Sequence, residues 1–224
     1  MTKRIDFESK SGNGIQGEIA EPEGTGKAPG LIVIQEWWGV NDHIRSYVDR
    51  FAKAGFITLA PDLYHGKVTK DGGEAAKLLG ALDWSVAVQD VAGALAVLEK
   101  HPRVNGKVGI TGFCMGGTIV LEQAIDNADL FVAAAPFYGA VKGIDPTKIQ
   151  MAICGSYGQR DTSIPANEVI AWAKALHVPN DVHEYPEAGH AFFDDQRGAY
   201  VPGAAANAWQ RTLAFFAKYL GRAS

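Results

Sequence analysis

Residues 108–120 read Val-Gly-Ile-Thr-Gly-Phe-Cys-Met-Gly-Gly-Thr-Ile-Val, which places one cysteine between glycines. The pattern Gly112-x-Cys114-x-Gly116-Gly117 is that of a nucleophile elbow, a sharp strand-to-helix turn, with cysteine in place of serine. Glycines are needed beside such a turn because the strand and the helix pass too close together for side chains. We therefore expect a strand before Cys114, a helix after it, and the sulfur above the carboxyl ends of the strands.

The elbow also sets the chemistry expected of the sulfur. Cys114 lies at the N-terminus of the predicted helix, where unpaired backbone N–H groups and the helix dipole favour negative charge. Thiolate is the nucleophilic form of cysteine. The backbone N–H of Met115 is expected to point at an oxyanion that forms on a substrate carbonyl. The alternative is a small buried cysteine that packs in a glycine-rich turn.

Outward from the elbow, short apolar runs alternate with amphipathic stretches. Strands alternating with helices indicate crossover connections, and thus a mostly parallel sheet covered by helices on both faces. The prediction is a three-layer α/β fold with an antiparallel N-terminal hairpin at one edge and no separate lid domain, in a single domain over residues 1–224. The hairpin is expected at residues 5–7 and 15–19, further strands at 31–34, 56–60, 107–110, 131–135, 151–154 and 182–185, and helices around 44–51, 88–98, 114–124, 168–176 and 209–220.

Composition excludes several functional classes. With 224 residues, 47% hydrophobic and 21% charged, the chain has enough apolar content for a core and does not match a disordered protein. The net charge of −4 argues against a nucleic-acid partner. No apolar run approaches a membrane span, and the N-terminus turns acidic where a signal peptide would be apolar, so we expect a cytoplasmic protein. Two cysteines, Cys114 and Cys154, do not suffice for a zinc site.

The two partners of a catalytic triad follow Cys114 in the order typical of this architecture, each in a loop after a later strand. Asp161 comes after the predicted strand at 151–154, in a turn before Pro165. His190 comes after the predicted strand at 182–185. We expect His190 to exchange protons with the thiol and the leaving group, and Asp161 to orient the imidazole. Taken singly, Asp161 is more typical of a turn residue and His190 of a surface histidine.

A second group of interest follows the predicted strand at 31–34, which ends in Gln35-Glu36-Trp37-Trp38-Gly39. In this architecture the loop after that strand supplies the second oxyanion N–H, which we assign to Trp37. A carboxylate at the end of a buried strand is costly unless it is paired, so Glu36 is expected to accept a hydrogen bond from the Cys114 thiol. The alternative is an exposed loop glutamate. Trp37 and Trp38 are expected to wall a pocket or to pack in the core.

Taken together, these residues resemble the dienelactone hydrolases, or carboxymethylenebutenolidases, of the α/β-hydrolase fold. The resemblance spans nearly the whole chain. It implies a Cys114-His190-Asp161 triad, a resting contact between Glu36 and the thiol, and an oxyanion hole formed by the N–H groups of Trp37 and Met115. It further implies no cofactor or metal and a monomer or weak homodimer. The motifs that carry it are Gln35 to Asn41, Ala60 to Tyr64, Gly106 to Gly117, Asp161 before Ile-Pro, and Glu187 to His190.

The chain departs from the family where two arginines grip the substrate carboxylate in members that act on dienelactones. One belongs to a segment before the helix near Leu78, where this chain is shorter and reads Asp71-Gly-Gly-Glu74. The other lies four residues after the catalytic histidine, where this chain has Asp194. Loss of both removes charge-assisted contacts to an anionic substrate. The residues expected to line the substrate pocket are Trp38, Tyr64, His65, Tyr138, Phe192 and Arg197, and Lys67 and Lys70 are further cationic candidates.

Three functions compete at this stage. The leading hypothesis is a cysteine-dependent hydrolase of a small ester or lactone that works through an acyl-enzyme. The second is acyl transfer or carbon-bond cleavage on the same fold. The third is a non-enzymatic sensor with a reactive Cys114, although Cys154, its available partner, is expected to pack beneath the sheet edge.

Overall fold

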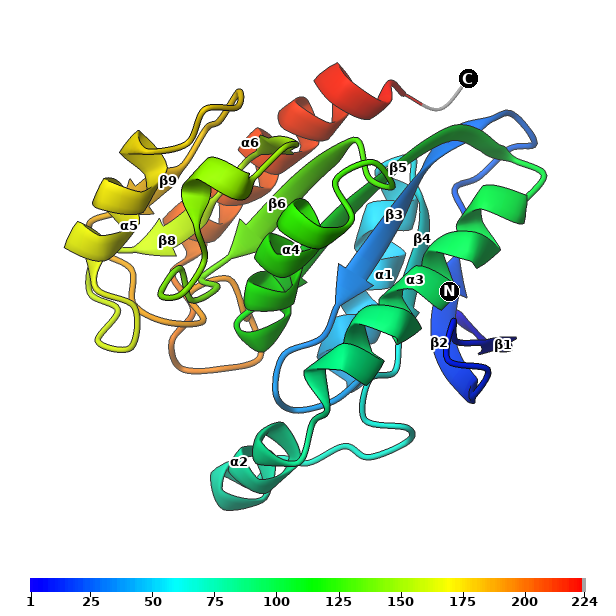
Figure 1. Ribbon diagram of the computed structural model, residues 1–224, viewed down its shortest axis with the longest axis horizontal. Helices are drawn as coiled ribbons and strands as arrows, with labels where there is room; N and C mark the ends of the chain where they lie inside the picture. The colour runs from blue at the N-terminus through cyan, green and yellow to red at the C-terminus, as the bar shows by residue number, and fades with distance from the viewer. Residues whose placement is uncertain (223–224) are drawn as a thin grey trace. The chain divides into compact units, whose positions relative to one another are not determined.

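The computed structural model describes residues 1–222, which form a mixed α/β structure with six α-helices in that range (Figure 1). Contacts divide these residues into two compact units, unit 1 with residues 1–109 and 221–222 and unit 2 with residues 110–220. The single domain expected over residues 1–224 stays a prediction. Unit 1 contains β1 (Lys3–Glu8), β2 (Gly14–Ala20), β3 (Ala28–Ile34), α1 (Asp42–Lys53), β4 (Ile57–Pro61), α2 (Gly72–Gly80), α3 (Trp84–Lys100) and the first part of β5 (Val104–Phe113). Unit 2 contains the end of β5, α4 (Met115–Asp126), β6 (Ala133–Phe137), the 3-10 helix η1 (Pro146–Lys148), β7 (Ala152–Ile153), β8 (Ser156–Gly158), α5 (Ala166–Lys174), β9 (His183–Tyr185) and α6 (Pro202–Leu220).

Unit 1 is built on strands in the order β1-β2-β4-β3-β5. The β1–β2 hairpin is antiparallel, with Lys3 opposite Ile19 and Glu8 opposite Gly14. Strand β2 also pairs antiparallel with β4, whereas β3 and β4 are parallel. The predicted N-terminal hairpin is therefore confirmed, and β1 forms an edge of the sheet.

Two helices of unit 1 cover β3 and β4, whose residues are buried along both strands. In Figure 1, α3 lies in front of these strands and α1 behind them. Helix α1 begins at Asp42 after the N-cap residue Asn41, whose Oδ1 accepts a hydrogen bond from the Ile44 N–H at 3.0 Å. It ends before Gly55, whose φ of 103° suits only glycine. Its buried face contains Tyr47 and Phe51, in agreement with the predicted amphipathic pattern.

In unit 2 the strands follow the order β5-β6-β8-β9, with β7 paired to β6. The β6–β7, β6–β8 and β8–β9 pairs are all parallel, as the alternation of elements predicts. In Figure 1, α4 lies in front of β6 and α6 lies behind it. Buried Thr111 donates from its hydroxyl to the Ala135 carbonyl at 2.7 Å, so the end of β5 is tied to β6.

The strand predicted over residues 151–154 is shorter than expected. It comprises only Ala152–Ile153, and a separate strand, β8, follows at Ser156–Gly158. Between them a Cβ on Gly155 would lie 2.9 Å from the Tyr157 ring, so the chain bends there with room for a glycine alone. The Ser-Tyr-Gly sequence of β8 has the composition of a turn, which is why it was not predicted as a strand.

Helix α2 is indicated by the family resemblance but not by the apolar pattern. Its N-cap is Asp71, whose Oδ1 accepts a hydrogen bond from the Glu74 N–H at 2.8 Å. Only Ala75 of this helix is buried, so no apolar stripe marks it in the sequence. Within residues 1–222 no single helix has the length and apolar content of a membrane span, and α2 and α3 reach that composition only as a pair bent by 89°.

The elbow glycines allow α4 and the end of β6 to approach closely. A Cβ on Gly117 would lie 2.6 Å from the Phe137 carbonyl oxygen, and a Cβ on Gly139 would lie 2.3 Å from the Gly117 carbonyl carbon. The Ala140 N–H also donates to the Thr118 hydroxyl at 2.9 Å. The steric reason predicted for glycine beside Cys114 therefore applies at Gly117.

Gly117→Ala is expected to destabilise the protein by about 1–3 kcal/mol, because the added methyl group meets backbone atoms that cannot turn aside. The measurement is the unfolding midpoint in guanidinium chloride. Gly203→Ala in α6 is the matched control, since a Cβ there has nothing within 4 Å and alanine favours the helix. Equal midpoints for Gly117→Ala and the wild type would contradict the close approach.

Candidate active site

Cys114 lies at the turn between β5 and α4 in a conformation that is rare outside glycine. Its φ is 56° and its ψ is −117°, and its side chain is partly exposed. The backbone holds this conformation at both ends: the Cys114 N–H donates to the Phe137 carbonyl at 3.1 Å, and the Cys114 carbonyl accepts from the Thr118 N–H at 3.2 Å. The helix therefore begins at Met115, one residue later than predicted. Strained backbone of this kind is concentrated at functional sites.

Asp161 and His190 meet as the sequence predicts. The His190 Nδ1 lies 2.6 Å from the Asp161 Oδ2, the distance of a short, charge-assisted hydrogen bond. The second carboxylate oxygen accepts the backbone N–H groups of Ser163 at 2.8 Å and Ile164 at 3.0 Å. The Asp161 side chain is only 1% exposed, so the turn that the sequence indicated now fixes a buried carboxylate against the imidazole.

The imidazole also hydrogen-bonds Cys114, and the two contacts together determine its charge. Burial lowers the pKa of His190, but the hydrogen bonds with Asp161 and Cys114 outweigh that effect and raise the pKa to about 10. The histidine is therefore protonated at neutral pH. A positive charge therefore lies beside the Cys114 sulfur, at the N-terminus of α4. Unit 2 thus brings together the three residues predicted as a triad: Cys114, Asp161 and His190.

Two predicted pocket residues pack around this histidine. The Tyr138 ring lies 5.2 Å from the imidazole between centroids, and the Phe192 ring lies 5.7 Å from Tyr138. Both rings are completely buried, so they limit the movement of His190. Tyr138 also has a positive φ of 37°, a second strained position beside the triad.

Arg197, another predicted pocket residue, is an ion-pair partner within its own loop. Its Nε lies 3.2 Å from Oδ2 of Asp194, which is 2% exposed. The Asp194 carboxylate also accepts the Gln196 N–H at 2.9 Å. Asp194, at the position where the resemblance implies an arginine, therefore pairs with the nearby Arg197, and no motif predicts this pair.

The remaining predicted residues belong to unit 1. Glu36 is buried at 2% exposure, which excludes an exposed loop glutamate. The rings of Trp37 and Trp38 meet edge to face at 4.9 Å. Tyr64 and His65 line a cavity of about 240 Å³ beside α2.

Unit 1 also holds two buried polar residues that the apolar pattern did not single out. The Asp90 Oδ2 lies 3.3 Å from the His65 Nε2, and burial raises the pKa of this carboxyl. Gln35 is completely buried, and its Oε1 accepts the Leu63 N–H at 3.1 Å. This hydrogen bond joins the loop after β3 to the loop after β4. Polar residues at the end of a buried strand were the only sequence signal for Gln35.

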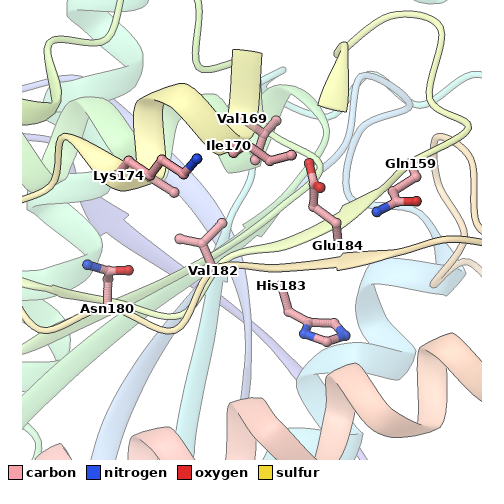
Figure 2. Close-up of a pocket in the computed structure, with 9 residues that line it drawn as sticks. Gln159, Val169, Ile170, Lys174, Asn180, Val182, His183 and Glu184 are labelled. Atoms are coloured by element: carbon pink, nitrogen blue, oxygen red, sulfur yellow. The ribbon is translucent and has the colours of Figure 1, made fainter. Parts of the chain in front are cut away.

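Cys154 differs from Cys114 in its exposure to solvent, which bears on the reactivity of a thiol. It is completely buried, and burial raises the pKa of its thiol to about 12. A neutral, buried thiol is inert, so the structure agrees with a packing role. The groove of about 500 Å³ along β9 and α5, drawn in Figure 2, contains none of the predicted catalytic residues.

Comparison with known proteins gives one consistent family. A model of the dienelactone hydrolase family matches residues 15–220. "Protein usf" from Aquifex pyrophilus is 36% identical over 98% of this chain and 100% of that protein. A Synechocystis protein named "Putative carboxymethylenebutenolidase" is 37% identical over 90% of this chain and 91% of that protein. The solved structure of P91, a dienelactone hydrolase-like promiscuous phosphotriesterase from metagenomic libraries, has a TM-score of 0.86 at 26% identity and covers 99% of each chain. The predicted fold class is confirmed.

Asp161→Asn is expected to lower the pKa of His190 from about 10, because the variant loses the carboxylate that stabilises the imidazolium. An NMR titration of the His190 ring protons measures the shift. Since the pKa is raised above 6.5, stabilisation by the charged histidine is complete below that pH and is lost as pH rises through about 10. The difference in unfolding free energy between the wild type and Asp161→Asn should shrink over the same window. Asp145→Asn, at an exposed cap of η1, is the control, and an unchanged His190 pKa in Asp161→Asn would contradict the assignment.

Proposed function

The chain belongs to the dienelactone hydrolase family, and we propose that it hydrolyses a small ester or lactone through a covalent intermediate on Cys114. The family supports a hydrolase of esters or lactones. The proposal of a covalent intermediate on Cys114 rests on the protonated His190, which is hydrogen-bonded both to a buried carboxylate and to the cysteine. Once the thiol has given its proton to Glu36, the thiolate–imidazolium pair needs no further base to start the reaction.

Acylation begins with attack of the Cys114 thiolate on the carbonyl carbon. The carbon–sulfur bond forms, and the carbonyl π electrons move to oxygen, which becomes the oxyanion. The N–H of Met115, at the start of α4, is proposed to donate to this oxygen. The oxyanion then re-forms the carbonyl and the carbon–oxygen ester bond breaks. His190 gives its proton to the departing alkoxide, which in a lactone stays attached to the acyl group.

Deacylation restores the thiolate–imidazolium pair of Cys114 and His190. Neutral His190 takes a proton from water, and the hydroxide so formed adds to the thioester carbonyl. Collapse of the second tetrahedral intermediate breaks the carbon–sulfur bond, so the carboxylic acid leaves and Cys114 is again a thiolate. The net change is addition of one water across one ester bond. Asp161 keeps the imidazole in one orientation through both half-reactions.

The roles of Glu36 and Trp37 come from the family resemblance. We propose that Glu36 holds the resting thiol and that the Trp37 N–H is the second oxyanion donor. The buried position of Glu36 supports the first role, because a buried carboxylate needs a partner. The residues proposed to line the substrate pocket are Trp38, Tyr64, His65, Tyr138, Phe192 and Arg197. That the protein is cytoplasmic and a monomer or weak homodimer stays a prediction.

Cys114→Ala is expected to lower kcat/KM for a short p-nitrophenyl ester by at least about 10³-fold, because the covalent route is lost. Release of p-nitrophenolate measures the rate. Cys154→Ala is the matched control, since that thiol is buried and neutral, and its rate should stay near that of the wild type. Equal rates for Cys114→Ala and the wild type would end the proposal.

Glu36→Gln tests the proposed contact between Glu36 and the Cys114 thiol. If Glu36 engages the thiol, removal of its charge should change both the rate of Cys114 alkylation by iodoacetamide and the pH dependence of that rate. Mass spectrometry of the labelled peptide separates Cys114 from Cys154. Glu74→Gln, on the exposed side of α2, controls for a general loss of negative charge. Superimposable pH profiles for Glu36→Gln and the wild type would show that Glu36 does not act on the thiol.

A further inference from the structure

The two loops that supply Asp161 and His190 begin side by side. Strands β8 and β9 are parallel neighbours, and Gly158, the last residue of β8, is opposite Tyr185, the last residue of β9. Asp161 follows three residues after β8, and His190 follows five residues after β9. The distance between carboxylate and imidazole therefore depends on how these two short loops are joined.

The backbones of the two loops are joined at successive points. The Gln159 N–H donates to the Tyr185 carbonyl at 3.0 Å, and the Arg160 N–H donates to the Ala188 carbonyl at 2.8 Å. At Gly158 the loops approach so closely that a Cβ would lie 2.4 Å from the Ala188 carbonyl oxygen. The ladder between the strands thus continues past their ends, to within one residue of Asp161.

Side chains extend the same junction. The Arg160 Nε donates to the Pro186 carbonyl at 3.1 Å, so one residue binds the His190 loop through both its backbone and its side chain. The Gln159 side chain hydrogen-bonds the Glu184 carboxylate. Figure 2 shows Gln159, just after β8, next to Glu184, the middle residue of β9. Burial raises the pKa of Glu184, although the bond from Gln159 opposes that rise.

We infer that Arg160 is a positioning residue that clamps the His190 loop against the Asp161 loop and so sets the 2.6 Å contact between His190 and Asp161. The inference rests on the proposed function. Arg160 is adjacent to Asp161 in the chain, and its side chain is exposed and need not touch substrate for this role. Small displacements of catalytic groups reduce rates strongly, so a clamp outside the site can control the chemistry.

The test compares Arg160→Met with Arg160→Lys. Methionine keeps an aliphatic side chain but cannot donate to the Pro186 carbonyl, whereas lysine keeps a donor. For a short p-nitrophenyl ester, Arg160→Met should lower kcat by about tenfold with KM changed less than about threefold. Arg160→Lys should recover part of the loss. Lys142→Met, at an exposed position of the same unit, removes the same charge and should match the wild type.

A second readout separates positioning from loss of stability. A weaker contact with Asp161 lowers the pKa of His190 in the free protein, so the alkaline limb of the kcat/KM profile should move to lower pH in Arg160→Met. A merely less stable protein would lose active fraction without moving this limb. Gly158→Ala forces the same loops apart while Arg160 is intact. It should also move the alkaline limb of the pH profile to lower pH.

Wild-type kcat and an unmoved alkaline limb in Arg160→Met would overturn the clamp. An equal loss in Lys142→Met would also overturn it, since charge alone would then explain the effect. The proposed function fails separately: if Cys114→Ala is as active as the wild type, the triad is wrong whatever Arg160 does. If Cys114→Ala is inactive and Arg160→Met is unaffected, only the clamp is wrong.

Discussion

The proposed chemistry of this protein depends on a single imidazole that lies between a buried carboxylate and a cysteine sulfur. Asp161 lies 2.6 Å from His190 and is almost completely shielded from water, so its charge acts on the ring at nearly full strength. That charge, together with the sulfur, outweighs the effect of burial and keeps the ring protonated. In the proposed mechanism, this protonated ring beside the sulfur at the start of α4 assists attack by the cysteine on the substrate carbonyl.

The rest of unit 2 serves to hold this contact. The three groups come from residues 114, 161 and 190, which follow the carboxyl ends of β5, β8 and β9, and β8 and β9 are parallel neighbours. Glycine is required at two of the junctions: Gly117 lets α4 cross the end of β6, and Gly158 lets the two loops meet. Tyr138 then packs against the imidazole, and Phe192 packs against Tyr138. Close packing of the backbone thus holds the proposed catalytic groups in position. A side chain that is displaced from this position would react more slowly.

Local rules explain which parts could be predicted from the sequence. The elbow and the order of the triad each follow from one residue type in one backbone context, so the sequence pointed to Cys114, Asp161 and His190, which the structure brings together, and their catalytic roles stay a prediction. The β8 strand was missed because its three residues resemble a turn and are stabilised by burial of Tyr157, a tertiary effect. The pairing of Arg197 with Asp194 and the junction at Arg160 depend on loop paths, which hydrophobic periodicity does not encode.

The most direct measurement of the central claim is mass spectrometry of the protein quenched during turnover of a slowly hydrolysed ester. We expect one added acyl group on the peptide that contains Cys114, none on the peptide that contains Cys154, and no adduct in Cys114→Ala. An acyl group on another residue, or an adduct that persists in Cys114→Ala, would contradict it.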